Sequence, residues 1–269
     1  MDIYLYTDEE GVAGVDWWDD RASVYKEDID RRQRARELLM GEVNAAANGA
    51  FAAGADRVVA VQGHAQSFIF ERADPRLEII TGSNYQEWLP AMSSKFNAAF
   101  CVGAHAMFGT KGATLAHTFS FEQKRQWWLN EKAIGEFGAF AAICAQHGVP
   151  VIMASGDDKF CAEATSLLPT IETACVKQGI WLNCACHLSH EKACSNIYDA
   201  AFRAVSRLMS DDEFDSYIPH GPAYTFKISA SEPFRFAPRP GVELTMLSPT
   251  SCLLTGANLL DVIASATSY

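Results

Sequence analysis

The sequence predicts an α/β fold, a mostly parallel sheet with helices on both faces, followed by a smaller C-terminal α+β domain. Short apolar runs alternate with longer segments of helical periodicity over most of the chain, which is typical of a parallel sheet with crossover helices. These runs are continuously apolar, as expected for strands covered on both sides. Two later segments, 223–229 and 242–247, alternate apolar and polar residues, which indicates strands with one exposed face.

The elements follow in order along the chain. The expected strands cover 3–7, 58–61, 77–80, 98–102, 126–129 and 151–154, and the weak alternation of 114–121 is compatible with a further strand. Apolar residues recur at intervals of three and four over 29–53, and 135–146 is small and apolar, so both are expected helices. Ser189 predicts the start of a helix over 190–209, and a final helix covers 259–266. We expect a catalytic domain over 1–185 and a smaller one over 186–269.

Composition excludes several classes of protein. The 269 residues carry a net charge of −11, which argues against nonspecific binding to nucleic acid or to an anionic membrane surface. No apolar run reaches the roughly 18 residues of a membrane span, and no signal peptide is visible. Most of the eight cysteines stand among small or apolar neighbours. We therefore expect reduced core cysteines and a cytoplasmic protein.

Acidic residues and histidines follow several of the expected strands. Asp8 and Glu10 follow the first strand, His64 follows the second, and His105 follows the strand at 98–102. Ligands of open α/β sheets bind beyond the carboxyl ends of the strands. Glu136 begins a helix of small apolar residues, where an unpaired carboxylate would be costly. We expect these five side chains to meet at one edge of the sheet.

This mixture of imidazole and carboxylate groups suits Zn²⁺ or a similar divalent ion. Five ligands are too many for one tetrahedral site, but with a bridging carboxylate they suit two ions about 3.5–4 Å apart, as in hydrolases. Each residue taken alone also has a structural interpretation: an aspartate as a cap or turn former, a histidine as a donor to backbone. The joint pattern favours a metal centre.

Several short motifs, in order, extend this interpretation. The segment 7–14, Thr-Asp-Glu-Glu-Gly-Val-Ala-Gly, resembles the Asp-x-Glu-Gly signature of the zinc-dependent D-aminopeptidase family. The resemblance continues through most of 1–180, at Gly63-His64, 103–106 (Gly-Ala-His-Ala), 116–118 (Ala-His-Thr), 135–138 (Gly-Glu-Phe-Gly), 156–158 (Gly-Asp-Asp) and 176–178 (Val-Lys-Gln).

The resemblance implies two Zn²⁺ ions per chain and a catalytic role for His117. The ligands that it implies are Asp8, Glu10, His64, His105 and Glu136. It also implies hydrolysis of a peptide or amide bond next to a free amino group in a small substrate, and a homo-oligomer, which in this family is a ring-shaped decamer. Asp157 and Asp158 follow another expected strand. There they either orient the metal ligands by hydrogen bonds, without binding the metal themselves, or cap the next helix.

Other interpretations stay open. Tyr6 replaces the small serine usual in the family, and Trp17 and Trp18 follow the motif, so an amidase or a peptidase of other specificity is the main alternative. A non-catalytic metal-binding protein is a third. The residues Cys184, Cys186, His187, His190 and Cys194 lack the paired spacing of structural zinc sites, which favours core cysteines beside a helix cap. Trp17, Trp18, Trp127 and Trp128 indicate either an exposed interface or the lining of a pocket or seam.

Overall fold

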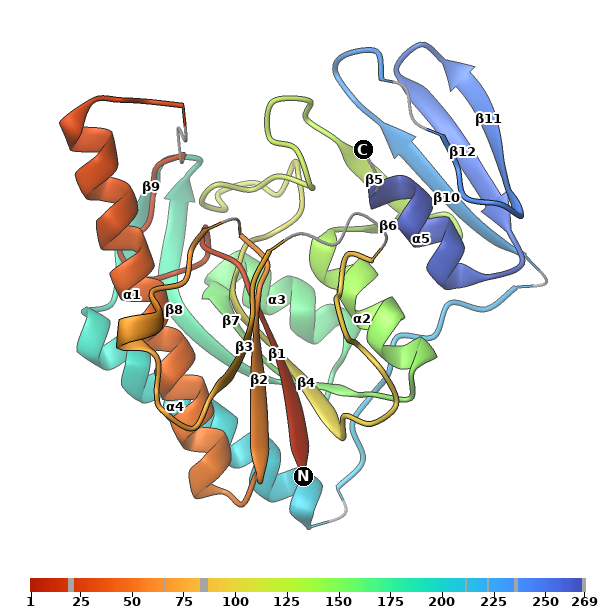
Figure 1. Cartoon of the computed structure of the whole chain (residues 1–269). Coiled ribbons are helices and arrows are strands. Elements are labelled where there is room, and N and C mark those ends of the chain that lie inside the picture. Colours follow the sequence, from red (N-terminus) through yellow and green to blue (C-terminus); the bar gives the residue numbers. More distant parts are fainter. Residues whose placement is uncertain are drawn as a thin grey trace.

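The computed structural model describes residues 1–18, 22–64, 66–82, 87–210, 212–221, 223–234 and 237–267. Its larger sheet has seven strands (Figure 1), and in spatial order these are β3 (Glu78–Ile80), β2 (Arg57–Gln62), β1 (Asp2–Thr7), β4 (Ala98–Ala104), β7 (Val151–Asp157), β8 (Glu172–Trp181) and β9 (Cys184–His187). Neighbouring strands pair in parallel, except that β9 is antiparallel to β8. The prediction of a mostly parallel sheet is confirmed.

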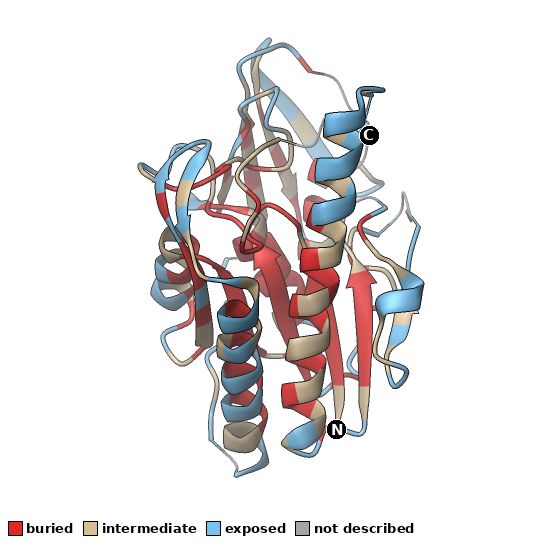
Figure 2. Ribbon diagram, turned by 90° about the vertical axis from the view of Figure 1, so that its left-hand side faces the viewer, coloured by how far each residue is buried: buried red, intermediate tan, exposed pale blue. Residues whose placement is uncertain are grey.

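Helices cover both faces of this sheet. Because side chains alternate along each strand, every strand contributes residues to the core on either face. Ile3 and Leu5 of β1 belong to the core formed with α1 (Lys26–Ala52) and α4 (His190–Met209). Tyr4 and Tyr6 face the opposite core, which contains α2 (Glu136–Gln146) and α3 (Asp158–Leu167). Figure 2 shows the buried strands behind helices whose outer sides are exposed.

A smaller antiparallel sheet lies beside α2 (Figure 1). In spatial order its strands are β11 (Val242–Ser248), β12 (Ser251–Gly256), β10 (Tyr224–Ser229), β5 (Gln126–Leu129) and β6 (Lys132–Ile134). The last helix, α5 (Leu259–Thr267), packs against β10 and β12, and a short 3₁₀ helix, η1, covers Phe70–Arg72. Both sheets draw on both parts of the chain, since β5 and β6 come before residue 186 and α4 packs on the larger sheet. The division into 1–185 and 186–269 stays a prediction about folding units.

Three features differ from the sequence-based expectations. The segment 114–121 forms turns rather than a strand, and the strands β6, β8, β9 and β12 were not expected. Polar residues interrupt the apolar pattern of β8 and β9, because these two strands form the outer end of the sheet, with β9 as the edge strand, and are only partly covered. For the same reason Cys175, Cys184 and Cys186 are exposed rather than part of the core.

The remaining cysteines fit the expectation better. Cys101, Cys144, Cys161 and Cys252 are buried, and all eight are free thiols. No helix in the described ranges combines the length and the apolar character that crossing a bilayer requires.

Candidate metal centre

Three adjacent strands bring most of the candidate ligands together. The strands β2, β1 and β4 are parallel neighbours, so their carboxyl ends lie at one edge of the sheet. Asp8 and Glu10 follow β1, His64 follows β2, and His105 comes directly after β4. Because β1 has neighbours on both sides that come later in the chain, this edge is a point where the strand order reverses, the usual ligand position in open α/β sheets.

Two glycines let the turn after β1 lie directly against the end of β4. Gly103 has a φ of 74°, and a Cβ there would stand 2.4 Å from the carbonyl oxygen of Asp8. A Cβ on Gly11 would stand 1.9 Å from the carbonyl oxygen of Ala104. The two segments are joined by a hydrogen bond of 2.7 Å from Gly11 N to the carbonyl oxygen of Gly103. Any side chain at either glycine would push the ligands apart.

The carboxylate of Asp8 lies between the two histidines. His64 Nδ1 is 3.5 Å from Asp8 Oδ1 and 3.3 Å from Glu10 Oε2. His105 Nε2 is 3.2 Å from Asp8 Oδ2 and 3.4 Å from Glu136 Oε1. Asp8 therefore presents one oxygen to each side of the cluster, which is the geometry of a bridging carboxylate.

The cluster divides into two groups of three, and within each group the candidate ligand atoms lie within 4.8 Å of one another. The groups are Asp8, Glu10 and His64, and His105, His117 and Glu136. Among the residues that the structure describes, these two groups are the ones that meet this criterion. The structure thus brings together all six residues singled out from the sequence.

The alternative cluster of cysteines and histidines does not assemble in the described part of the chain. His190 Nε2 lies 3.6 Å from Cys194 Sγ, but no third ligand completes a group there. His187 Nδ1 accepts a hydrogen bond of 2.9 Å from Gly14 N. The preferred interpretation, core cysteines beside a helix cap, is confirmed for the cap, since Ser189 caps α4, but is wrong for Cys184 and Cys186, which are exposed.

Backbone carbonyls fix the orientation of two imidazole rings. His105 Nδ1 lies 3.0 Å from the carbonyl oxygen of Ala106, and His117 Nδ1 lies 2.9 Å from that of Leu115. A carbonyl oxygen only accepts, so Nδ1 carries the proton in both rings. In the neutral form of each ring, Nε2 therefore directs its lone pair into the cluster, the arrangement typical of metal-binding and proton-transferring histidines.

The charges in the cluster favour a cation. Burial acts to raise the pKa of Glu10, but His64 outweighs it and holds the pKa well below its usual range. Burial likewise opposes ionisation of Glu136, whose pKa is lowered by His105. The pKa of His105 is raised well above its usual value, because Asp8 and Glu136 outweigh the effect of burial. Ionised carboxylates held close together in a buried site attract divalent ions.

Two observations show that the residues fit metal ions. Glu10 Oε2 is buried and accepts no hydrogen bond from the part of the chain that the structure describes. A hollow of about 10 Å³ lies against Asp8, His105 and Glu136, with Tyr6 in its wall. This volume is about that of one water-sized group. The nitrogen and oxygen donors suit zinc.

The loop that contains His117 is strained and firmly held. Leu115 and Phe119 have φ values of 53° and 63°, unusual for residues other than glycine. Phe119 N donates a hydrogen bond of 2.7 Å to Glu136 Oε1. The ring of His117 stacks on that of His105 at 3.9 Å, and its Nε2 lies 3.9 Å from Glu136 Oε1. These contacts fix the imidazole beside the candidate ligands.

Aromatic residues surround the centre rather than forming an exposed patch. Trp18 stacks on Phe121 at 4.0 Å and meets the ring of His117 edge-on at 5.3 Å. Trp127 is buried, and Trp17 and Trp128 are half-buried. Trp127 therefore belongs to the core, whereas an interface role for the half-buried Trp17, Trp18 and Trp128 stays a prediction.

The two aspartates after β7 bind backbone. Asp157 Oδ1 caps α3 by accepting from Phe160 N at 2.7 Å, and its Oδ2 accepts from Thr114 N, at the start of the His117 loop, at 2.8 Å. Asp158 Oδ1 accepts from Gly179 N on β8 at 2.9 Å. Asp157 thus serves both as the helix cap and as an anchor of the loop that leads to His117.

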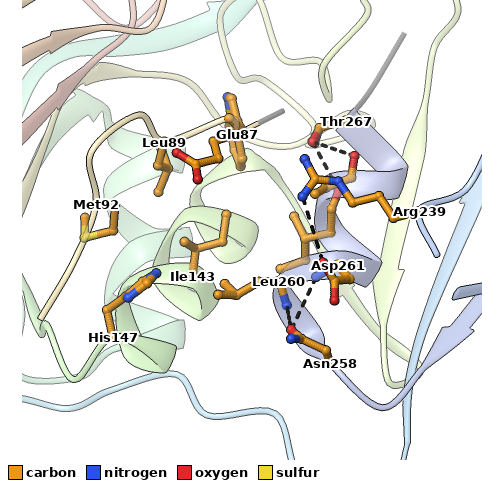
Figure 3. A pocket seen from close by; sticks show the side chains of 13 residues that line it. Glu87, Leu89, Met92, Ile143, His147, Arg239, Asn258, Leu260, Asp261 and Thr267 are labelled. Carbon is orange, nitrogen blue, oxygen red and sulfur yellow. Dashed lines mark hydrogen bonds and ion pairs between the residues drawn. The ribbon is translucent and has the colours of Figure 1, made fainter. Parts of the chain in front are cut away.

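A second pocket, of about 270 Å³, lies between α2 and α5 (Figure 3). None of the six candidate residues lines it; its walls are Glu87, Trp88, Leu89, Met92, Ile143, His147, Arg239, Asn258, Leu260, Asp261, Ile263, Ala264 and Thr267. Trp88 links this pocket to the centre, since its Nε1 donates to Tyr6 Oη at 3.1 Å.

Sequence reasoning gave no role to two buried charged residues beside the centre, although Lys177 lies in the motif 176–178 that contributes to the resemblance. Glu42 is fully buried and Lys177 is 2% exposed. Glu42 stands four residues from both Leu38 and Ala46 on the buried side of α1, a signal that the helical periodicity contained. Lys177 lies in a strand that was itself not expected.

Comparisons with known proteins identify the family and the fold. The model of peptidase family M55, described as D-aminopeptidase, matches residues 1–237. A D-aminopeptidase of Bacillus subtilis (strain 168) is 30% identical over 198 residues, which cover 72% of this chain and 69% of that protein. The solved structure of the Zn-dependent D-aminopeptidase DppA from Bacillus subtilis, described as a self-compartmentalizing protease, aligns with a TM-score of 0.84 at 22% identity. That alignment covers 99% of this chain and 95% of the other, and shows that the two share a fold.

Proposed function

The chain belongs to the M55 family of D-aminopeptidases, and we propose that it hydrolyses the peptide or amide bond next to a free amino group with the help of two zinc ions. The observation that supports this most directly is the position of Asp8, whose two oxygens face separate groups of ligand atoms. The description of the related DppA structure as Zn-dependent supports the choice of metal.

The residues divide between the two ions as the geometry suggests. Asp8 Oδ1, Glu10 and His64 Nδ1 would hold one ion, and Asp8 Oδ2, His105 Nε2 and Glu136 would hold the other. When bound, such a pair of ions polarises the scissile carbonyl and lowers the pKa of a water molecule toward neutrality.

His117 is the proposed acid–base residue. The carbonyl oxygen of Leu115 holds the proton on Nδ1, so Nε2 is the atom that takes up a proton and returns it to the leaving nitrogen. Glu136 Oε1, 3.9 Å away, stabilises the imidazolium while it carries that proton. Trp18 lies against the His117 ring, which limits the ring's rotation and the access of bulk water.

A substrate panel tests the proposed reaction. We expect D-aminoacyl amides and D-dipeptides to be hydrolysed fastest, and the same compounds acetylated at the amino group to be inert, because cleavage requires the free amine. The measurement is kcat/KM for each compound, with L-isomers and small amides that lack an α-amine alongside. The bulky Tyr6 motivates the last group. Faster turnover of those amides would replace this proposal with a small-molecule amidase.

Metal content tests the ligand assignment. We expect about two zinc ions per chain after purification without chelators, and His105→Ala should lose about one of them, because it removes a ligand of one group only. Elemental analysis by mass spectrometry measures both. His147→Ala, at the end of α2 and outside the centre, is the matched control. Protein without stoichiometric metal contradicts the assignment.

Removing the acid–base group should separate chemistry from metal binding. We expect His117→Ala to retain both zinc ions and to lower kcat by about 10²-fold or more, because a positioned acid–base group usually accelerates the reaction by at least that factor. Since His117 also lies in one of the two ligand groups, metal content is the deciding control. Loss of an ion would make His117 a ligand, and unchanged turnover would remove it from the mechanism.

Assembly into a homo-oligomer, with a decamer as the family precedent, completes the proposal. The description of the related structure as self-compartmentalizing supports it. A closed assembly would admit only small or extended substrates and protect folded cytoplasmic proteins. Light scattering coupled to size exclusion should give a multiple of the 29.5 kDa chain mass. A particle of the monomer's mass at micromolar concentration contradicts it.

A further inference from the structure

The ammonium group of Lys177 donates its hydrogen bonds to carbonyl oxygens of a single turn of the chain. Its side chain is 2% exposed, and Nζ donates to the carbonyl oxygens of Glu10 at 2.5 Å, Val15 at 2.6 Å and Val12 at 3.2 Å. An ammonium group has three donors, so all of them are used here. The turn they bind is the one that follows β1 and begins with the candidate ligand Glu10.

Two further side chains hold the same turn from other directions. Glu42 Oε1 on α1 accepts from Ala13 N at 2.8 Å, and His187 Nδ1 on β9 accepts from Gly14 N at 2.9 Å. The turn's own hydrogen bonds, from Val12 N to Glu9 O and from Val15 N to Val12 O, are short-range. The backbone bond from Gly11 N to Gly103 O ties the start of the turn to β4. Beyond Gly11, the bonds that hold residues 12–15 to the rest of the fold come from these side chains, and Lys177 makes the most of them.

A buried ammonium is costly unless other charges and acceptors compensate it. Burial lowers the pKa of Lys177 to about 8, and the nearby carboxylates of Asp157 and Glu42 oppose this effect. An apolar residue of similar length would fill the same space without this cost. What Lys177 adds is its three hydrogen bonds to the turn.

We propose that Lys177 is a positioning residue for the metal centre. By binding the carbonyl oxygen of Glu10 itself, it fixes the backbone from which the Glu10 carboxylate reaches His64 and Asp8, and so prepares the ligand geometry before a metal ion binds. It acts through Glu10 and does not contact the ion. This inference rests on the proposed function, because it takes Glu10 as a metal ligand.

The test is removal of zinc from the loaded, full-length protein by a chromophoric chelator, which reports the affinity of each ion without reference to activity. We expect Lys177→Met to weaken one of the two ions by about 10-fold or more, the usual effect of losing a partner that orients a ligand. The other ion should be retained as in the wild type. Lys159→Met, which removes a lysine bonded to Asp158 and Gly179 O, is the matched control and should change neither affinity.

A double-mutant cycle distinguishes positioning from general support of the fold. If Lys177 acts through Glu10, Lys177→Met should have little further effect on zinc affinity in a Glu10→Gln background. Equal weakening of both ions, a lower melting temperature with unchanged zinc affinity, or full additivity with Glu10→Gln would overturn the inference. If Lys177→Met does not fold, zinc affinity is measured for Lys177→Arg instead. This variant keeps the positive charge but displaces the hydrogen-bond donors.

The cycle also separates this inference from the proposed function. If Glu10→Gln itself leaves both zinc affinities unchanged, the ligand assignment fails. If Glu10→Gln weakens one ion and neither Lys177 variant does, the ligand assignment stands and Lys177 has no positioning role.

Discussion

The contact on which the centre depends is the close approach between the turn after β1 and the end of β4. Gly11 and Gly103 leave room for it, and the hydrogen bond between their backbones closes it. Because of this contact, Asp8 reaches His105 with one oxygen while its other oxygen faces His64. Parallel pairing of β2, β1 and β4 brings the strand ends to one edge, but only side-chain-free backbone lets the ligands come within reach of one another.

Burial then determines the chemistry of the cluster. In a medium of low polarity, a carboxylate stays ionised only beside a positive charge or a strong donor. Histidines serve this purpose for Glu10 and Glu136, and the carboxylates in turn raise the pKa of His105. On the other side of the same turn, the backbone carbonyls satisfy the ammonium of Lys177. The turn thus lies between a negatively charged cluster and a buried cation, which leaves it little freedom to move.

The loop around His117 shows a different way of fixing a side chain. Two non-glycine residues in the left-handed region cost conformational energy, which the surrounding contacts must offset. Asp157 binds the start of this loop, and Glu136 binds the backbone of Phe119 near its end. The same carboxylate is therefore a candidate ligand, an anchor of the loop and a partner of the His117 ring, so metal binding and the position of His117 are physically linked.

The sequence by itself predicted five of the seven strands of the larger sheet, the main helices and the six residues of the candidate centre. Asp8, Glu10, His64 and His105 could be predicted because strand ends in a parallel sheet converge, whereas His117 came from the family resemblance. The sequence also contained the signal for Glu42, in the periodicity of α1. Only the tertiary structure shows that Asp8 lies between His64 and His105, that Trp127 is buried and that Lys177 binds the carbonyl oxygen of Glu10. These depend on contacts between segments far apart in the sequence, as between Lys177 and Glu10, which are 167 residues apart. Local patterns cannot specify such contacts, since periodicity reports which side of an element is buried but not what it is buried against.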